Sequence, residues 1–300
     1  MRILITGGTG LIGRRLCGAL LAKGHEITVL SRRPARVGDV CGPGVRAMAA
    51  LSEWTPEVQF DAVVNLAGEP IVDARWTAKR QEILLDSRVA LTRDLVACMA
   101  VAKSKPSVFL SGSAIGWYGD TGDQLINENG VAGLDFGARL CVQWEQQAVK
   151  ANDLGIRTVI LRTGLVFDAT GGMLHKMLLP FKLGLGTRLG DGQQWMSWIH
   201  IEDYVAALLF VSEQTNVNGV VNMTAPGAVR NGEFTQTLAD VLHRPACLVA
   251  PAGLLKMAMG EMAILLLGGQ RVIPQVLNKA GFVFRYPVLQ PALKNLLQKE

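Results

Sequence analysis

A run of glycines directly after the first apolar segment limits most strongly which fold this chain can adopt. Arg2–Thr6 is expected to form a β-strand, and the chain continues as Thr6-Gly7-Gly8-Thr9-Gly10-Leu11-Ile12-Gly13 into an amphipathic helix. In such a unit, Gly7 permits a tight turn, Gly10 lets the backbone approach a pyrophosphate, and Gly13 lets the helix pack closely on the sheet. We therefore predict a dinucleotide-binding loop, with a purely structural turn as the alternative. Its predicted contact residues are Gly7, Thr9, Gly10, Leu11, Ile12 and Gly13.

Short apolar runs alternate with amphipathic stretches through the first half of the chain. The expected strands are Arg2–Thr6, Glu26–Ser31, Ala62–Leu66, Ser107–Ser111 and Arg157–Leu161, and the expected helices are Leu11–Lys23, Lys79–Ala102 and Phe136–Leu154. Apolar strands separated by helices are typical of a parallel sheet that is buried on both faces. The pattern predicts an α/β, doubly wound parallel-sheet Rossmann fold.

The alternation weakens after about Asp168. Further expected elements are the helices Met173–Leu183, Ile201–Glu213 and Asn231–Leu242, the last with Asn231 as its N-cap, and the strand Val220–Thr224. The final segment is rich in proline and methionine. We predict a Rossmann domain over residues 1–168, to which 196–224 return, and a smaller, interleaved C-terminal substrate-side domain from 169–195 and 225–300.

The end of the second expected strand indicates which dinucleotide binds. NAD sites usually place an acidic residue there to bond the ribose 2′-hydroxyl. This chain has Val29-Leu30-Ser31-Arg32-Arg33-Pro34 instead, with no acid. Two guanidinium groups and a hydroxyl suit a 2′-phosphate. We predict NADP(H), bound by Ser31, Arg32 and Arg33, with a solvated basic turn as the alternative.

Composition excludes several other classes. Hydrophobic residues make up 49% of the chain and charged residues 18%, which is not typical of disordered, collagen-like or coiled-coil chains. The net charge is +5, but basic residues occur as scattered pairs such as Arg14–Arg15, so we expect no nucleic-acid partner. The five cysteines form no C-x-x-C pair and the four histidines show no metal-ligand spacing, so free thiols and no metal are expected.

The N-terminal residues and the longest apolar stretch indicate in which cellular compartment the protein is expected. Met1 leads straight into an apolar strand without a small-residue cleavage site, so we expect no signal peptide. The stretch Gly253–Gly269 is interrupted by Lys256 and Glu261 and is too short to span a membrane. We expect a cytoplasmic protein in which this stretch is a buried helix pair, as core or as a lid over the pocket. A hydrophobic homodimer face is the alternative.

Several motifs together resemble the extended short-chain dehydrogenase/reductase family. Beside the glycine loop, they are Asn65-Leu66-Ala67-Gly68, Ser111-Gly112-Ser113-Ala114, Arg162-Thr163-Gly164-Leu165-Val166-Phe167 and Trp198-Ile199-His200-Ile201-Glu202-Asp203. The closing motifs, Gly260-Glu261-Met262, Gly269-Gln270-Arg271-Val272-Ile273-Pro274 and Gly281-Phe282-Val283-Phe284, resemble one atypical branch, the NADP-binding sugar-nucleotide epimerase-like proteins. The resemblance covers essentially the whole chain.

The resemblance implies further cofactor contacts. Leu66 and Ala67 should line the adenine side through their backbone, and Leu165 and Val166 should lie beside the nicotinamide. Arg88 stands where many extended members carry an asparagine near the nicotinamide ribose. It could bond a cofactor phosphate or replace a lost catalytic cation, or it could simply face solvent.

The chain departs from the family in its catalytic residues. The family uses Ser or Thr with a Tyr-x-x-x-Lys pair, in which the lysine lowers the tyrosine pKa. Ser113 matches the serine, but Gly137 and Cys141 occupy the tyrosine and lysine positions. Tyr118 is the best remaining phenol for proton transfer, with core packing as the equal alternative. We predict Ser113 and Tyr118 as catalytic residues.

These observations predict an epimerase or oxidoreductase that uses NADP(H) on a nucleotide sugar or a similar small substrate. The alternative is a non-catalytic NADPH-binding redox sensor or scaffold that has lost the Tyr-x-x-x-Lys pair. The missing pair favours the sensor. The retained Ser113 and the substrate-side domain favour an enzyme.

Overall fold

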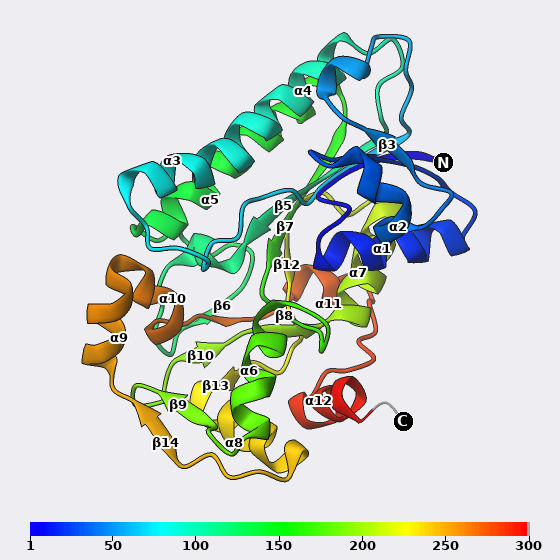
Figure 1. Cartoon of the computed structure of the whole chain (residues 1–300). Coiled ribbons are helices and arrows are strands. Elements are labelled where there is room, and N and C mark those ends of the chain that lie inside the picture. Colours follow the sequence, from blue (N-terminus) through cyan, green and yellow to red (C-terminus); the bar gives the residue numbers. More distant parts are fainter. Residues whose placement is uncertain (299–300) are drawn as a thin grey trace.

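A seven-stranded parallel sheet forms the centre of the molecule (Figure 1). The computed structural model describes residues 1–298. The strands run in the order β12-β7-β5-β4-β1-β2-β3, with bounds β1 Arg2–Thr6, β2 Glu26–Leu30, β3 Arg46–Met48, β4 Ala62–Asn65, β5 Val108–Ala114, β7 Arg157–Thr163 and β12 Gly219–Met223. Strand order reverses beside β1, where open α/β sheets bind ligands at the carboxyl ends of their strands. The doubly wound parallel sheet is confirmed.

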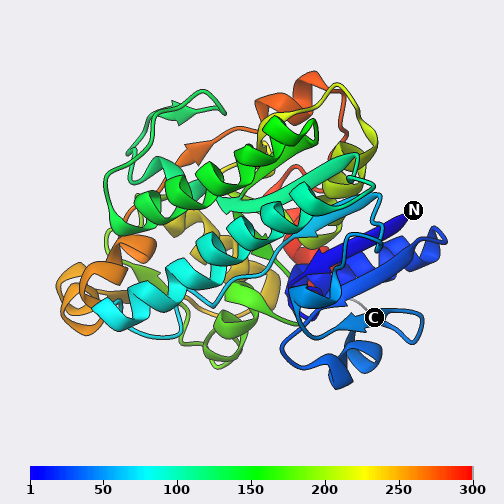
Figure 2. The same cartoon turned by 90° about the horizontal axis from the view of Figure 1, so that it is seen from above.

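Helices cover both faces of this sheet. Their bounds are α1 Leu11–Ala22, α2 Val37–Cys41, α3 Ala78–Leu85, α4 Leu91–Val101, α5 Phe136–Ala148 and α7 Ile201–Glu213. Side chains alternate along each strand, so Leu4 of β1 packs in one cluster with α4 and α5, while Ile3 and Ile5 pack in another with α1 and α7. Both views show α4 and α5 lying side by side (Figure 2).

Two expected helices differ in detail from the prediction. The helix predicted over Lys79–Ala102 consists of α3 and α4 joined by a π-helical turn, Asp86–Ala90. One extra residue in that turn shifts the side chains that follow it, which no apolar period reveals. The helix predicted over Phe136–Leu154 leaves the α conformation after Ala148 and ends as a 3₁₀ helix.

The rest of the chain forms a smaller region below the sheet in Figure 1. Its bounds are β6 Leu125–Ile126, β8 Leu165–Phe167, α6 Gly172–Lys182, β9 Thr187–Leu189, β10 Trp195–Met196, β11 Trp198–His200, β13 Val229–Arg230, α8 Asn231–Leu242, β14 Leu248–Ala250, α9 Ala252–Met259, α10 Ile264–Leu267, β15 Arg271–Val272, α11 Gln275–Lys279 and α12 Leu289–Leu297. Short two-stranded pairs link distant segments, and α11 packs against β12 of the main sheet. The small region therefore interleaves with the sheet, while the domain boundaries given above stay a prediction.

The expected cap of α8 is wrong. Asn231 is the first helical residue, and Arg230 holds the capping position. The Asn231 amide oxygen instead accepts a hydrogen bond from the Leu189 amide at 3.0 Å, which joins α8 to β9. A tertiary contact has taken the side chain that local sequence assigns to a cap.

The expectation of a buried helix pair over Gly253–Gly269 holds for one half only. Met262 is buried in a cluster with Trp76 and Phe136, so the segment leading into α10 closes against α3 and α5. α9 is different, because Leu254 is 60% and Met257 77% exposed. The homodimer face that this helix could provide stays a prediction.

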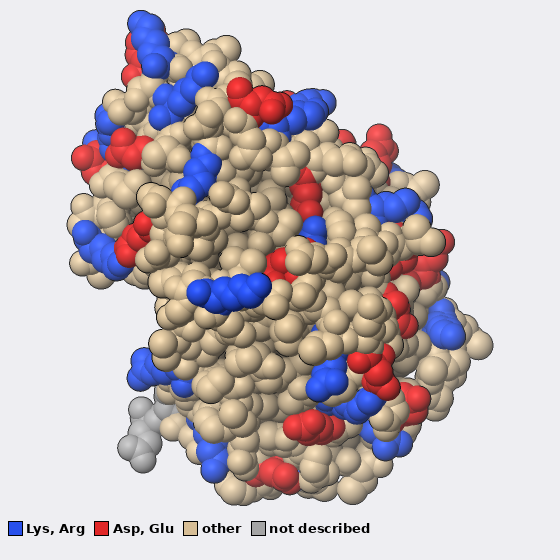
Figure 3. Space-filling view, turned by 180° about the vertical axis from the view of Figure 1, so that it is seen from behind, with Lys and Arg blue, Asp and Glu red and all other residues tan. Residues whose placement is uncertain are grey.

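Charge and hydropathy of the described residues agree with this architecture. No helix within residues 1–298 has the length and apolarity needed to cross a membrane. On the face shown in Figure 3, lysine and arginine side chains are interspersed with aspartate and glutamate. The five cysteines are all unpaired.

Candidate functional site

Backbone crowding fixes the glycine loop that joins β1 to α1. Gly7 has φ +70°, and a Cβ atom added to it would lie 2.7 Å from the carbonyl of Leu66. A Cβ on Gly13 would lie 2.2 Å from the Gly7 carbonyl oxygen. Both positions therefore require glycine, because loop, helix and β4 are in close contact.

Gly10 has a different environment. A Cβ atom there would approach only the Gly7 carbonyl oxygen, at 3.2 Å, and the residue is exposed. Gly10 also precedes the first turn of α1, and it has no side chain with which to cap the helix amides. This side of the loop is open to a ligand, and the helix terminus favours an anion there.

A buried hydrogen-bond chain holds the end of β4 beside the loop. The Thr6 hydroxyl donates to the Asn65 side-chain oxygen at 2.7 Å and accepts from the Ala67 amide at 3.1 Å. The Asn65 amide donates to the Thr92 hydroxyl at 2.8 Å, which also accepts from the Trp144 indole at 2.9 Å. The predicted contacts Leu66 and Ala67 are thereby fixed against the glycine loop. No sequence motif predicts this hydrogen-bond chain, because only the packing of four elements brings its residues together.

The basic turn after β2 lies across from the end of β4. Arg32 Nη1 is 2.7 Å from Glu69 Oε1, although the Arg32 side chain is 90% exposed. The Ser31 hydroxyl accepts from the Arg33 amide at 3.1 Å. An exposed ion pair contributes little, so Arg32 can exchange Glu69 for a phosphate at small cost. Ser31, Arg32 and Arg33 are together on the surface, as a 2′-phosphate site requires.

The loop after β8 covers the start of α1. A Cβ on Gly171 would lie 2.9 Å from Leu11 Cδ1, and Leu165 and Val166 of β8 are half-buried beneath this loop. β8 pairs in parallel with β11, so that Leu165 lies opposite Trp198. A Cβ on Gly172 would lie 3.1 Å from Leu11 Cδ2 and 3.6 Å from the Val166 carbonyl oxygen, so Leu11 and Val166 lie near one another although the sequence places them far apart.

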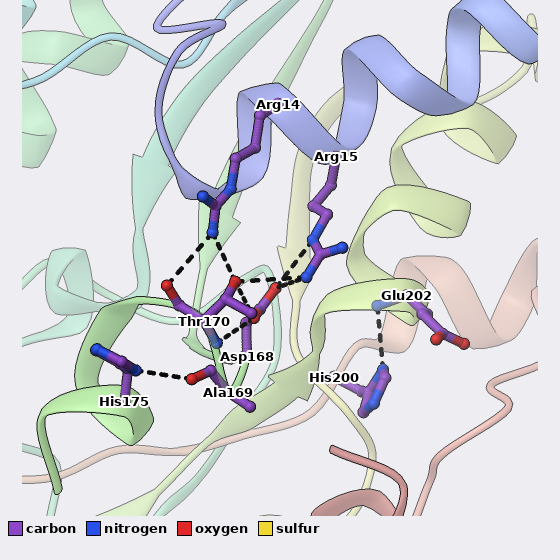
Figure 4. Close-up of polar contacts among 8 residues, drawn as sticks. All are labelled: Arg14, Arg15, Asp168, Ala169, Thr170, His175, His200 and Glu202. Carbon is purple, nitrogen blue, oxygen red and sulfur yellow. Dashed lines mark hydrogen bonds and ion pairs between the residues drawn. The ribbon is translucent and has the colours of Figure 1, made fainter. Parts of the chain in front are cut away.

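Two arginines of α1 hold this loop in place (Figure 4). Arg15 donates to Asp168 through Nε at 3.1 Å and Nη2 at 3.0 Å, and Arg14 donates to the Thr170 hydroxyl at 2.6 Å. Burial alone would raise the pKa of the Asp168 carboxyl, but hydrogen bonds from Thr170 and the Arg15 charge lower the pKa overall. Asp168 therefore stays ionised and keeps the loop on α1.

His200 has a structural role in the same view. Its Nδ1 accepts from the Glu202 amide at 3.1 Å and caps α7 (Figure 4). Its ring also stacks on that of Tyr286, with 4.0 Å between the ring centroids. Among residues 1–298 there is no group of three or more histidine, cysteine, aspartate or glutamate side chains arranged to hold a metal ion.

A buried charged cluster lies at the carboxyl ends of β5 and β7. Ser113 donates to Glu145 Oε1 at 2.5 Å, and Arg162 donates to both Glu145 oxygens at 2.9 and 2.8 Å. The Arg162 guanidinium also stacks on the Trp117 ring at 3.5 Å. The sequence analysis missed Glu145 and Arg162. The available signal was Arg162 directly after the apolar run of β7, because a buried charge needs a partner.

Tyr118 lies beside this cluster but bonds elsewhere. It is 2% exposed, and its hydroxyl donates to the Asn222 side-chain oxygen at 2.8 Å. Burial raises the pKa of the phenol, and the Arg162 charge opposes this only in part. In this structure the two hydroxyls donate to different partners, Ser113 to Glu145 and Tyr118 to Asn222, although the Tyr118 ring also lies 4.9 Å from the Arg162 guanidinium. The pairing of Ser113 and Tyr118 as catalytic residues stays a prediction.

The two positions of the missing pair hold small side chains. Cys141 is buried, and burial followed by the nearby Glu145 charge raises the pKa of its thiol to about 12. A neutral thiol is a poor nucleophile, so Cys141 serves as packing. Arg88 projects from the π-helical turn into the same corner, where it donates to the Glu69 carbonyl oxygen at 2.8 Å.

Surface hollows elsewhere do not mark the site. One of about 310 Å³ lies between α1, α7 and α12 and is lined by Arg15, Glu202 and Leu296 among others. Another, of about 560 Å³, lies at the opposite edge of the sheet, around Arg157 and Asn218. Neither includes the glycine loop or the charged cluster. Strand topology locates the site better, because ligands of open α/β sheets bind at the carboxyl ends of the strands.

These features define a Rossmann-type α/β protein with a smaller second region, and known proteins show the same combination. Residues 3–224 match the NAD dependent epimerase/dehydratase family, and residues 250–296 match a domain of unknown function, DUF1731. The chain belongs to the NAD dependent epimerase/dehydratase family.

Individual relatives extend the match over the whole chain. It is 40% identical to the epimerase family protein Mb2239 of Mycobacterium bovis, over 97% of this chain and 96% of that one. Human epimerase family protein SDR39U1, isoform 2, crystallised with NADPH, has a TM-score of 0.91 at 35% identity, covering 100% of both chains. A nucleoside-diphosphate sugar epimerase from Corynebacterium glutamicum has a TM-score of 0.77 at 30% identity, covering 99% of this chain and 58% of that one. The predicted atypical branch is confirmed.

Proposed function

We propose that this protein binds NADP(H) and uses it as an epimerase or oxidoreductase on a nucleotide sugar or a similar small substrate. The observation that carries the proposal is the exposed, acid-free basic turn at the end of β2, beside the open side of Gly10. An NAD site would carry an acid there. The human relative crystallised with NADPH supports the same cofactor.

The cofactor would lie along the carboxyl ends of β2, β1, β4 and β8. Its pyrophosphate would meet Gly7, Thr9, Gly10, Leu11, Ile12 and Gly13, its 2′-phosphate Ser31, Arg32 and Arg33, its adenosine Leu66 and Ala67, and its nicotinamide Leu165 and Val166. When bound, NADP(H) supplies or accepts a hydride at the nicotinamide. The protein's own residues must then orient the substrate and handle one proton.

Ser113 and Glu145 are placed to handle that proton. The Ser113 hydroxyl can accept a proton from a substrate hydroxyl while it passes its own proton to Glu145, 2.5 Å away. Arg162 holds the carboxyl in place through both oxygens. Tyr118 can take part only if it gives up its bond to Asn222, so we assign the first proton step to Ser113.

A nucleotide sugar is the proposed substrate class. The 30% identical Corynebacterium relative is named a nucleoside-diphosphate sugar epimerase, and its match covers 99% of this chain, the smaller region included. The cysteines of the described chain are unpaired, which supports the cytoplasm as the compartment.

One observation favours the alternative, a non-catalytic NADPH sensor or scaffold. Gly137 and Cys141 provide neither phenol nor amine, and the Tyr118 hydroxyl is already bonded inside the protein. A sensor needs the glycine loop and the basic turn but no proton relay.

Cofactor binding and turnover together decide between these functions. NADPH binding is measured by fluorescence titration, and turnover by cofactor absorbance and product analysis over a panel of nucleotide sugars and carbonyl compounds. We expect binding, and turnover of at least one compound that falls about 10²-fold in Ser113→Ala with NADPH affinity retained. Binding without turnover of any panel member would favour the sensor. Absence of binding would contradict both.

A further inference from the structure

Arg88 lies in an unusual backbone segment beside the corner that contains Ser113, to which the proposed function assigns the first proton step. It occupies the middle of the π-helical turn, Asp86–Ala90, that joins α3 to α4. Such turns insert one residue into a helix and often occur where a side chain must be redirected toward a functional site. Here the turn directs Arg88 toward the carboxyl ends of β4 and β5.

The guanidinium of Arg88 is enclosed by neutral groups. Nη2 donates to the Glu69 carbonyl oxygen at 2.8 Å, and Nη1 donates to the Ser87 hydroxyl at 3.3 Å. Its Cζ atom lies 5.5 Å from the Trp144 ring and 2.8 Å from the place that a Cβ on Gly68 would occupy. A side chain at Gly68 would therefore require the arginine to move.

Glu69 is the carboxylate that acts on this charge, and it does so without forming an ion pair with Arg88. Within residues 1–298 Arg88 forms no ion pair, and the carboxylate of Glu69 instead faces Arg32 at 2.7 Å and Arg80 at 3.7 Å. Partly buried cations normally have an anionic partner, because removing a charge from water is costly. Burial accordingly lowers the pKa of Arg88, although an arginine stays charged at neutral pH.

This unpaired charge lies in the corner that contains Ser113. The Trp144 ring beside Arg88 packs on Gly112, the residue before Ser113, so that a Cβ on Gly112 would lie 3.0 Å from the ring. The Arg88 charge also acts on the Cys141 thiol, at the position where the resembled family carries its lysine. The positive charge of this corner therefore comes from Arg88 on the π-helical turn, whereas the resembled family places a lysine on the helix that corresponds to α5.

A fixed positive charge at this place distinguishes the two redox forms of the cofactor. The nicotinamide ring carries a positive charge in NADP⁺ and none in NADPH, whereas the two forms share every other charged group. Glu145 cannot offset the effect, because Arg162 already neutralises it. Resting on the proposed cofactor function, we infer that Arg88 makes this site prefer NADPH to NADP⁺.

The test compares dissociation constants of the full-length protein for both forms. NADPH is titrated by its fluorescence, and NADP⁺ by competition with it. We expect the wild type to bind NADPH about tenfold more tightly than NADP⁺, a difference of about 1.4 kcal/mol that a single nearby charge can produce. Arg88→Gln should bring the two constants close together, whereas Arg88→Lys, which keeps the charge, should preserve the preference. Arg93→Gln, on an exposed arginine of α4, is the matched control and should change neither constant.

Each outcome bears on a different claim. Equal affinities in the wild type would overturn the inference without any variant, even if Arg88→Gln fails to fold. If Arg88→Gln weakens both forms equally and the ratio stays, Arg88 only shapes the site and the inference is wrong. If the wild type binds neither form, the proposed function fails and the inference falls with it.

Discussion

The glycine loop and the charged cluster around Glu145 differ in what defines their geometry and in how open they are to a ligand. The loop is defined by backbone contacts and is open: Gly7 and Gly13 are crowded by main-chain atoms, while Gly10 faces free space. The cluster is defined by side chains and is closed, with Ser113, Glu145 and Arg162 all less than 9% exposed. The loop is open to a charged ligand, whereas in the cluster the charges of Glu145 and Arg162 are paired with each other.

This contrast shows where the protein can tolerate change. In the loop, a new side chain blocks a ligand without exposing a buried charge. In the cluster, loss of one partner leaves the other unsatisfied inside the protein. Substitutions in the loop should therefore affect binding, and substitutions in the cluster should first affect folding.

The largest effect is expected from Glu145→Ala. Removal of the carboxylate leaves the Arg162 guanidinium, which is 3% exposed, without its counter-charge. We expect the free energy of unfolding to fall by about 3–5 kcal/mol, measured by urea denaturation. Glu145→Leu combined with Arg162→Met removes both charges and should lose clearly less. Equal losses in the single and double variants would show that packing, and not charge pairing, makes the cluster stable.

Gly10→Val should have the next largest effect, and on binding alone. Its side chain would extend into the open space that a pyrophosphate needs, so NADPH affinity should fall about 100-fold or more while the melting temperature stays near that of the wild type. Gly13→Val is the matched variant, in which the Cβ meets the Gly7 carbonyl oxygen at 2.2 Å. That variant should lose stability as well. A folded Gly10→Val protein with unchanged NADPH affinity would refute the loop as the cofactor site.

The same contrast explains how much the sequence alone could predict. The loop was predictable because glycine spacing reports directly on backbone geometry, and the strands beside it follow from apolar runs. The cluster was not, because Ser113, Glu145 and Arg162 come from three elements that only the folded sheet brings together. The bond between Tyr118 and Asn222 joins residues of β12 and the turn after β5, and no local pattern contains it.

Arg32→Asp tests the cofactor preference at the rim of the loop. The wild type should bind NADPH at least about tenfold more tightly than NADH, a difference of about 1.4 kcal/mol. Arg32→Asp should narrow or reverse this ratio, because an acid repels the 2′-phosphate and accepts from a 2′-hydroxyl. Arg36→Asp makes the same charge change at an exposed position beyond the end of β2. An Arg32→Asp ratio no different from that of Arg36→Asp would place the 2′-phosphate elsewhere.

The smallest effect is expected from Gly18→Ala, a substitution at a glycine outside the proposed cofactor site. Gly18 lies on the exposed face of α1, one helix turn beyond the glycine loop, and a Cβ there would have no atom within 4 Å. Alanine is the better helix former, so Gly18→Ala should raise the free energy of unfolding by about 0.5–1 kcal/mol and leave NADPH affinity unchanged.

Gly24 also borders open space, but its φ is +76°. Gly24→Ala should therefore lower stability, since L-residues adopt that conformation at a cost. If both variants shift the urea midpoint of unfolding in the same direction, the space around the added methyl group, and not the backbone conformation, determines the change in stability at these positions. The crowding argument for Gly7, whose φ is +70°, would then rest on its contact with Leu66 alone.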